Sequence, residues 1–267
     1  MGADIKSLRT RIKSVDSTLH LTKAMGLVAS SKIRRATLAM NQGREYAKAI
    51  NEAVETLSAC RDCQSSPFMT VRDTKRTRLV VIAGDRGLAG GYNANVFRLV
   101  KSLGEAEIIP IGKRACDRFG GKYNSAENFQ SLDGAELAKD LCSDFAKGEY
   151  DRLGIVRSHY HSVMSQEAEV IWVLPLTKSE GKGNGGMIFE PDELTVLNAL
   201  MQEYVAGIIT ASVRESFACE VAARRCAMDS AGKNAQEMID TLQLQYNRAR
   251  QGAITQEITE IVAGSGT

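Results

Sequence analysis

Apolar residues recur every three or four positions through the first part of the chain. From Ile5 to Leu57 only Thr22 and two glycines interrupt this spacing. A proline-free periodic stretch of this length is longer than an ordinary globular helix and is typical of one strand of a coiled coil, about 80 Å long at 1.5 Å per residue. Small residues at the seam predict a close approach of the partner helix, and these are Gly26, Ala29, Ala36 and Gly43.

A second long helix is expected from about Asp192 to Val262, with Pro191 just ahead of its start, where proline is tolerated. Its apolar positions change phase along the way, which indicates local changes in winding. If the two helices run antiparallel and are flush where they meet the middle segment, paired residue numbers sum to about 249. Roughly 16 residues after position 246 then extend past the first helix as an unpaired end, about 24 Å long.

Strand and helix patterns alternate between these two arms. Apolar strands are predicted at 78–84, 107–112, 153–160 and 169–174, with amphipathic helices at 93–103 and 132–148. Such alternation predicts a small, mostly parallel, doubly wound sheet. The expected fold class is therefore α/β, with a long antiparallel two-helix coiled coil formed by the N- and C-terminal arms plus a central Rossmann-like domain.

The expected domain boundaries follow from these patterns and from the prolines. The first coiled-coil helix is assigned to 1–59 and the second to 192–267. The α/β domain is assigned to 76–176, and a linker to 177–191.

A glycine-rich turn follows the first predicted strand, at the place where a Rossmann enzyme holds a pyrophosphate. Its glycines are at 84, 87, 90 and 91, which does not match the GxGxxG spacing of dinucleotide sites. The second strand ends in Gly112, Lys113 and Arg114 rather than in an acidic residue. The sequence therefore does not favour nucleotide binding, and GKGNGG (181–186) is no Walker A motif either.

The composition is that of an ordinary globular protein, with 43% hydrophobic and 25% charged residues. We expect no membrane span, because no apolar run approaches about 20 residues, and no secretory signal, because the chain begins polar. Charge is unevenly spread: residues 1–59 hold ten basic and five acidic side chains, and residues 193–267 hold six basic and nine acidic ones. Opposite signs on the two arms favour their pairing.

The sequence offers little catalytic chemistry. The six cysteines are expected to be free thiols, and the CxxC of Cys60 and Cys63 has no second pair to complete a zinc site. His159 and His161 share one face of a predicted strand without an evident third ligand. We therefore expect no catalytic residue, no metal site and no cofactor in this chain.

Three segments resemble the gamma subunit of rotary F-type ATP synthases of the bacterial type. They are LTKAMGLVASSKI (21–33), AGDRGLAGGYN (83–93) and YNRARQGAITQEITEIVAGSG (246–266), with weaker matches at VMSQ (163–166), LPL (174–176) and FEPD (189–192). They occur in the family's order and extend over essentially the whole chain. Departures from the family pattern are Gly26, Met187 and Ser265.

The resemblance implies a non-catalytic central-stalk rotor that couples transmembrane proton flow to ATP synthesis in the beta-subunit catalytic sites by rotation. The implied partners are the alpha and beta subunits, the epsilon subunit and the c-subunit ring, without nucleic acid. The implied location is the cytoplasmic face of the bacterial inner membrane, where the chain is a peripheral protein attached through the complex.

The resemblance also implies contact residues, position by position. Met25 and Arg224 match shaft positions near the beta-subunit lever loops, and Asp85, Arg86 and Gly87 match the turn near the lower end of the beta subunits. The positions that match contacts to a beta-subunit catch loop are Arg250, Gln251, Thr255 and Glu257. Those that match contacts to the c ring and epsilon are Met187, Phe189 and Glu190, where Met187 replaces an expected aromatic residue.

Two other functions remain open on the residues alone. One is a Rossmann-like ligand-binding enzyme with helical dimerisation arms, which would bind its ligand at the turn between Gly84 and Gly91. The other is a nucleic-acid binder that uses the basic first arm, whose affinity would fall steeply with salt. The missing dinucleotide fingerprint weighs against the first, and the acidic second arm weighs against the second.

Overall fold

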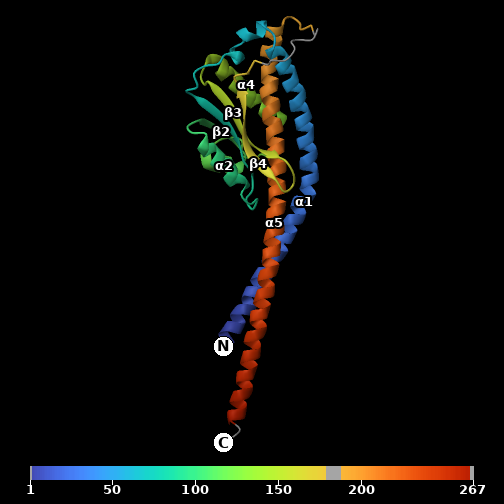
Figure 1. The fold of residues 1–267 in the computed structure, drawn as a ribbon, viewed down its shortest axis with the longest axis vertical. Coiled ribbons are helices and arrows are strands. Elements are labelled where there is room, and N and C mark those ends of the chain that lie inside the picture. Colours follow the sequence, from blue (N-terminus) through green and yellow to red (C-terminus); the bar gives the residue numbers. More distant parts are fainter. Residues whose placement is uncertain (1, 179–187, 265–267) are drawn as a thin grey trace. The chain divides into compact units, whose positions relative to one another are not determined.

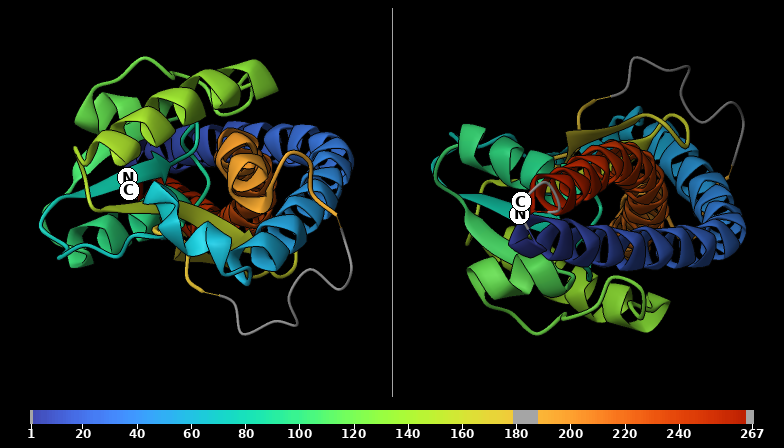
Figure 2. Two further views of the ribbon diagram at one scale, coloured as in Figure 1. Left: turned by 90° about the horizontal axis from the view of Figure 1, so that it is seen from above. Right: turned by 90° about the horizontal axis from the view of Figure 1, so that it is seen from below.

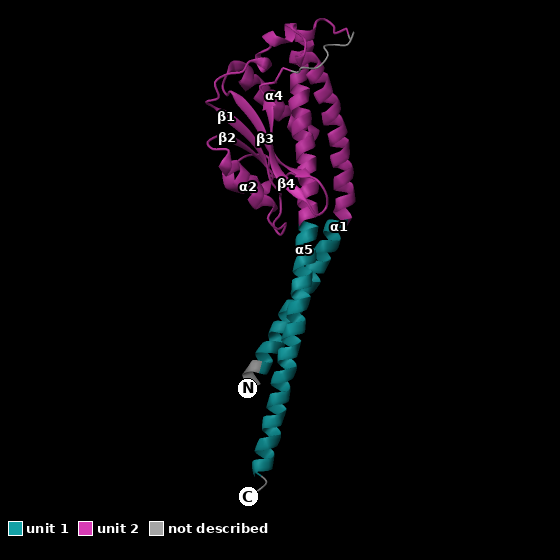
Figure 3. Cartoon of the chain, viewed as in Figure 1, with its two compact units in different colours: residues 1–30, 224–267 teal, residues 31–223 magenta. Residues whose placement is uncertain are grey.

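The computed structural model describes residues 2–178 and 188–264, in two compact units (Figure 3). The helical unit comprises residues 1–30 and 224–267, and the sheet unit comprises residues 31–223. Two long helices contribute to both units, α1 (Gly2–Ser58) and α5 (Glu193–Gly264). Within each unit they lie side by side with opposite chain directions (Figure 1). The predicted antiparallel pair of long helices is confirmed.

The sheet unit contains a four-stranded sheet in the order β2-β1-β3-β4. Its strands are β1 (Thr77–Ile82), β2 (Glu107–Ile111), β3 (Arg152–Tyr160) and β4 (Gln166–Leu174). β1 pairs parallel with both β2 and β3, whereas β4 returns antiparallel to β3 after a short connection. The mostly parallel sheet is confirmed, with one antiparallel edge strand that a hairpin can supply.

Helices cover both faces of this sheet, as a doubly wound fold requires. Side chains alternate along β1, so Leu79 and Val81 pack on one face, while Val80 and Ile82 pack on the other. The first face carries α2 (Tyr92–Ser102) and α3 (Lys113–Phe119), and the second carries α4 (Ser131–Lys147) and the two long helices. Figure 2 shows α2 and α4 on opposite sides of the sheet.

Three short elements were not predicted from the sequence. α3 is a seven-residue helix that begins after Gly112 and ends at Gly120. Two 3₁₀ helices, η1 (Asp62–Ser65) and η2 (Pro67–Met69), follow the end of α1. Such short elements show too few turns for an apolar period to stand out.

The first half of α5 is a core element of the sheet unit. Every fourth residue of this half lies in the same buried cluster as α4 and the sheet, namely Leu197, Met201, Val205, Ile209 and Val213. α5 also contains one stretch that is long and apolar enough to cross a membrane, and 61% of that stretch is buried inside the protein. This extent of burial is what a core helix shows.

The register of the two long helices differs from the one predicted from lengths. A methyl group added at Gly43 would lie 3.5 Å from the Cβ of Ala211, and one added at Gly26 would lie 3.7 Å from the Cβ of Met228. Both pairs of residue numbers sum to 254 rather than to about 249, a shift of about 7.5 Å along α5. The predicted register was therefore wrong by about five residues.

The arms are not flush where they leave the sheet, which explains the error. Leu57, next to the end of α1, shares its buried cluster with Leu197. Because α5 already begins at Glu193, it starts one turn before the level of Leu57. The corrected register leaves about 12 residues after Gly252 as the unpaired end of α5, about five fewer than the length-based register leaves in a helix that ends at Gly264.

The corrected register predicts which cysteine pairs will crosslink. Gly43→Cys with Ala211→Cys is expected to form an intrachain disulfide on mild oxidation, because the two Cβ positions are 3.5 Å apart, at the near end of the disulfide range of about 3.5–4.5 Å. The control is Gly43→Cys with Ala206→Cys, the pair that the length-based register places together. Peptide mass spectrometry of the oxidised chain would identify the bridge, and faster closure of the control pair would contradict the register.

Candidate functional site

The glycine-rich turn at residues 84–91 is tied to the following segments through one carboxylate. Asp85 accepts hydrogen bonds from Ser125 Oγ and the Ala126 N–H, both at 2.7 Å, from the Glu127 N–H at 3.0 Å and from the Lys113 N–H at 3.1 Å. Asp85 is thus committed to contacts inside the sheet unit. The side chains that point outward from the turn are Arg86, 67% exposed, and Leu88, 62% exposed.

The same turn is also bonded to α5 through Glu220, which is 1% exposed. Its two carboxylate oxygens accept the N–H groups of Asp85 and Arg86, each at 3.2 Å. The N–H of Gly84 donates to Asn93 Oδ1 at 2.9 Å. In a phosphate site such N–H groups would face the ligand; here they donate to the protein's own side chains, which weighs against the ligand-binding enzyme.

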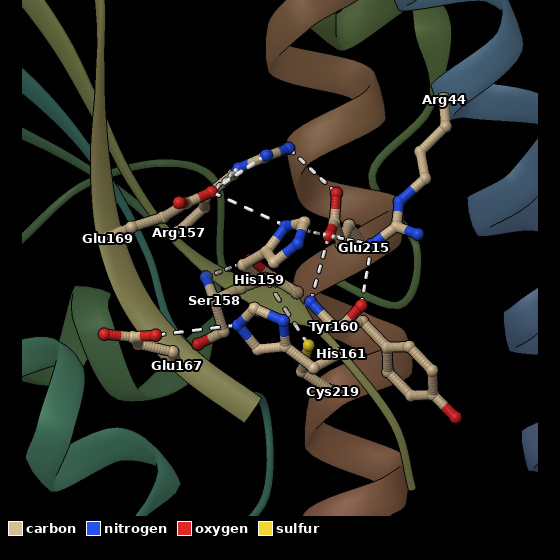
Figure 4. Close-up of polar contacts among 11 residues, drawn as sticks. Arg44, Arg157, Ser158, His159, Tyr160, His161, Glu167, Glu169, Glu215 and Cys219 are labelled. Carbon is tan, nitrogen blue, oxygen red and sulfur yellow. Dashed lines mark hydrogen bonds and ion pairs between the residues drawn. The ribbon is translucent and has the colours of Figure 1, made fainter. Parts of the chain in front are cut away.

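A second carboxylate of α5 forms the centre of a charged network (Figure 4). Glu215 is 1% exposed and lies between two arginines, with Arg44 Nη2 of α1 at 2.5 Å and Arg157 Nη1 of β3 at 2.8 Å. It also accepts the Tyr160 N–H at 3.0 Å, and His159 Nδ1 lies 2.8 Å from its Oε1. Arg157 reaches on to Glu169 of β4 at 2.9 Å. One carboxylate therefore joins α1, α5 and β3, and through Arg157 also β4.

The surroundings of Glu215 favour its charged form. Burial by itself would raise the pKa of this carboxyl group, but the hydrogen bonds from Arg44 and the Tyr160 N–H and the charge of Arg157 outweigh burial and lower the pKa. The same contact with Glu215 raises the pKa of Arg44. The contact between Glu215 and Arg44 thus favours the charged form of both groups.

The two predicted shaft contacts, Met25 and Arg224, both belong to the helical unit and are half-buried. The length-based register would have placed them opposite one another. In the observed register Met25 of α1 lies level with about Asp229, so the two side chains are offset by about 7.5 Å along the helices.

The predicted tip residues lie in the last part of α5 and are exposed. Arg250, Gln251, Thr255 and Glu257 all present their side chains to solvent. Gly252 has no atom within 4 Å of the position a side chain would take. The exposed apolar side chains of this segment are Ile254, Ile258, Ile261 and Val262.

The fourth group of predicted contacts lies just before α5. Met187 is outside the described residues. Phe189 is half-buried and packs against the main core cluster, whereas Glu190 is exposed.

The candidate metal and thiol groups show structural contacts. Within residues 2–178 and 188–264, no group of three or more His, Cys, Asp or Glu side chains is arranged to hold a metal ion. His159 and His161 pack edge to face, with ring centroids 4.6 Å apart. All six cysteines are free, and burial raises the pKa of Cys63 to about 11 and that of Cys142 to about 12. Such thiols are mostly protonated at neutral pH.

Sequence reasoning missed Glu215 and Glu220. A signal was present, because Arg214 is the only other charged residue in the stretch of small and apolar residues from Ala211 to Ala222 that contains both acids. A charged residue on a buried helix face is rarely left without partners. The identity of those partners depends on tertiary contacts far away in the sequence.

Comparison with known proteins shows which family the chain resembles. The ATP synthase family matches residues 4–267 of the chain. The ATP synthase gamma chain of Ruminococcus albus is 40% identical, that of Moorella thermoacetica is 38% identical, and in both comparisons 98% of each chain is covered. The gamma chain of a Staphylococcus epidermidis strain is 36% identical with the same coverage.

Solved structures agree on the fold. A chain of the Euglena gracilis mitochondrial ATP synthase, from a structure of its OSCP/F1/c-ring, has a TM-score of 0.72 at 19% identity and covers 98% of this chain and 94% of its own. A chain of the Tetrahymena thermophila mitochondrial ATP synthase, from its central stalk and c-ring, has a TM-score of 0.61 at 21% identity, covering 79% of this chain and 99% of its own.

The fold thus defines a protein with a small, mostly parallel α/β sheet and a long antiparallel pair of helices. Because the gamma-chain relatives match along nearly their whole length, the chain belongs to the gamma chain family of ATP synthases.

Proposed function

We infer that this chain is the central-stalk rotor subunit of an F-type ATP synthase, which couples transmembrane proton flow to ATP synthesis by rotation. The observation that carries this inference is that the chain matches gamma chains over nearly their whole length, at up to 40% identity. Its two longest elements are also a pair of helices that pack together. The subunit itself is a non-catalytic part of the stalk. We propose that the catalytic sites belong to the beta subunits.

The partners are the alpha and beta subunits, the epsilon subunit and the c-subunit ring. As a gamma chain, the subunit is part of a membrane-associated complex. We propose that it lies on the cytoplasmic face of the bacterial inner membrane and is attached only through the complex.

We propose four contact regions for these partners, two in the helical unit and two in or beside the sheet unit. In the helical unit, Met25 and Arg224 contact the beta-subunit lever loops. At the unpaired end of α5, the residues that contact a beta-subunit catch loop are Arg250, Gln251, Thr255 and Glu257. Their exposure supports this role, because polar side chains at a helix end without a neighbour are available to a partner.

The other contact regions lie in or beside the sheet unit. Asp85, Arg86 and Gly87 lie in the turn that faces the lower end of the beta subunits. In this turn Arg86 is the exposed member, while Asp85 shapes the loop. Phe189 and Glu190, together with Met187, form the contact to the c ring and epsilon.

The close packing of the long helices supports a mechanical role. At Gly43 and Gly26 the partner helix comes so near that a methyl group would already touch it. Interiors packed at this density transmit strain rather than absorb it. A shaft of this kind can change the conformation of each beta site in turn, which alters the affinity of that site for nucleotides and phosphate.

Copurification of the tagged chain from its own cells tests this function. We expect stoichiometric alpha, beta and epsilon subunits with the chain. We also expect no ATPase activity from the isolated chain, because no group of acidic or histidine side chains among the described residues is arranged to hold Mg²⁺ beside a phosphate. Recovery of the chain without these subunits, or ATP turnover by the chain alone, would contradict the proposal.

A further inference from the structure

The glycine-rich turn is attached to α5 at both of its ends. At the first end, Glu220 accepts the N–H groups of Asp85 and Arg86. At the second end, the Tyr92 hydroxyl donates to the Ser216 carbonyl of α5 at 2.9 Å, and Tyr92 packs with Cys219. The turn is therefore connected directly to the long helix as well as to its neighbours in the sheet.

The geometry at Glu220 leaves little freedom. A side chain at Gly84 would place its Cβ 2.7 Å from Cδ of Glu220, so glycine is required for the carboxylate to reach the backbone. Each carboxylate oxygen is matched to one N–H group, at 3.2 Å in both cases. A two-point contact of this kind fixes the direction of the turn as well as its distance from α5.

Packing alone does not account for a carboxylate at this place. A buried charge costs free energy unless its hydrogen bonds are satisfied. Ala223, which is three residues further along α5 and shares the face of Glu220, packs against the cluster of Ala89 and Tyr92, so an apolar side chain is tolerated on this face. Backbone N–H groups that lose their acceptor inside a protein are also costly. The carboxylate and the two N–H groups therefore form a matched set.

We propose that Glu220 is a positioning residue, which locks the turn to α5 so that the exposed Arg86 and Leu88 move with the shaft helix. This proposal rests on the proposed rotor function, in which the turn faces the beta subunits. It assigns Glu220 no contact with those subunits. Its role is to keep the turn from yielding when the shaft is under load.

Two variants test the lock, and the chain alone suffices for the first measurement. In Glu220→Ala, hydrogen exchange at the N–H groups of Asp85 and Arg86 is expected to become about ten-fold faster, since each loses its acceptor. The Gly84 N–H, held by Asn93, serves as an internal reference. In Glu220→Gln, one oxygen remains, so only one of the two N–H groups is expected to exchange faster.

The second measurement uses the assembled, membrane-reconstituted complex. We expect Glu220→Ala to lower proton-driven ATP synthesis several-fold while ATP hydrolysis continues, so that fewer protons are pumped per ATP. Glu220→Gln should restore much of this coupling. A purely structural role would lower synthesis and hydrolysis together, along with the yield of complex.

The matched control is Glu136→Ala, which removes a carboxylate of the sheet unit from an exposed pair with Lys122. It is expected to change neither exchange in the turn nor coupling. If hydrogen exchange at Asp85 and Arg86 is unchanged in Glu220→Ala, Glu220 does not hold the turn to α5. If exchange is faster but coupling remains complete, Glu220 is not a positioning residue for the rotor. If Glu220→Ala does not fold, the exchange and coupling of Glu220→Gln decide by the same criteria. Failure of the unmodified chain to assemble with beta subunits would instead refute the rotor function.

Discussion

Replacing Glu215 by alanine is expected to lower the free energy of unfolding of the chain by about 3 kcal/mol, because the substitution leaves a buried charge network without its central acceptor. Arg44, Arg157 and the Tyr160 N–H would all lose the same partner. Glu215→Gln keeps the volume and one acceptor oxygen and should cost less, about 1–2 kcal/mol. Urea denaturation of the full chain measures both.

The control for this prediction is Glu136→Ala, whose ion pair with Lys122 has side chains 61% and 62% exposed. Exposed pairs contribute about 0–1 kcal/mol. A loss of stability in Glu215→Ala no larger than that of the control would show that the network is dispensable.

The network also predicts how stability depends on pH. The pKa of Glu215 is lower in the folded chain than its ordinary value, so its contribution is fully present above the unfolded-state pKa of about 4.3. It is lost as pH falls below that value, through the folded-state pKa. The stability difference between the wild type and Glu215→Gln should therefore be constant from pH 7 to about pH 5 and shrink in more acidic solution.

Gly112→Ala is expected to cost about 4 kcal/mol, the largest effect of any single methyl group considered. Gly112 has φ +94°, a conformation that favours glycine, and an added Cβ would lie 2.0 Å from the carbonyl oxygen of Ala83. Backbone strain of roughly 1–3 kcal/mol and overpacking of roughly 1–3 kcal/mol add together here. The clash is with backbone of the segment just before the turn, which cannot move aside as a flexible side chain can.

Gly104→Ala separates the two causes. Gly104 has φ +85°, but no atom lies within 4 Å of the added Cβ. This variant should show the backbone strain alone, about 1 kcal/mol. Equal midpoints of urea denaturation for the two variants would show that the contact with Ala83 is not rigid.

Much of the fold could be predicted because its patterns are local. The long helices follow from a spacing of three and four that continues without proline, and the strands at 77–82 and 107–111 follow from short apolar runs. The helix register could not be predicted in the same way. It depends on where α5 begins relative to the last turn of α1, and a difference of one turn shifts every pair along the seam.

The same distinction between local sequence patterns and tertiary contacts applies to the candidate contact residues. Residues such as Arg250 and Glu257 could be proposed from motif resemblance, because the motif gives their positions and the structure shows that both side chains are exposed. Asp85 belongs to the motif as well, but its carboxylate binds the chain itself. Glu215 and Glu220 were missed because their significance depends on partners that only the tertiary fold brings near. Buried carboxylates in an apolar helical stretch are the sequence signal that could have identified them.

Rotation of the chain inside its complex is the central claim, and observing single complexes tests it most directly. The complex with alpha and beta subunits would be fixed to a surface through the beta subunits, with a bead on a cysteine introduced at the exposed Lys122 of the sheet unit. On addition of ATP we predict that the bead turns continuously in one direction. A bead that stays still while the same complexes hydrolyse ATP would contradict the account.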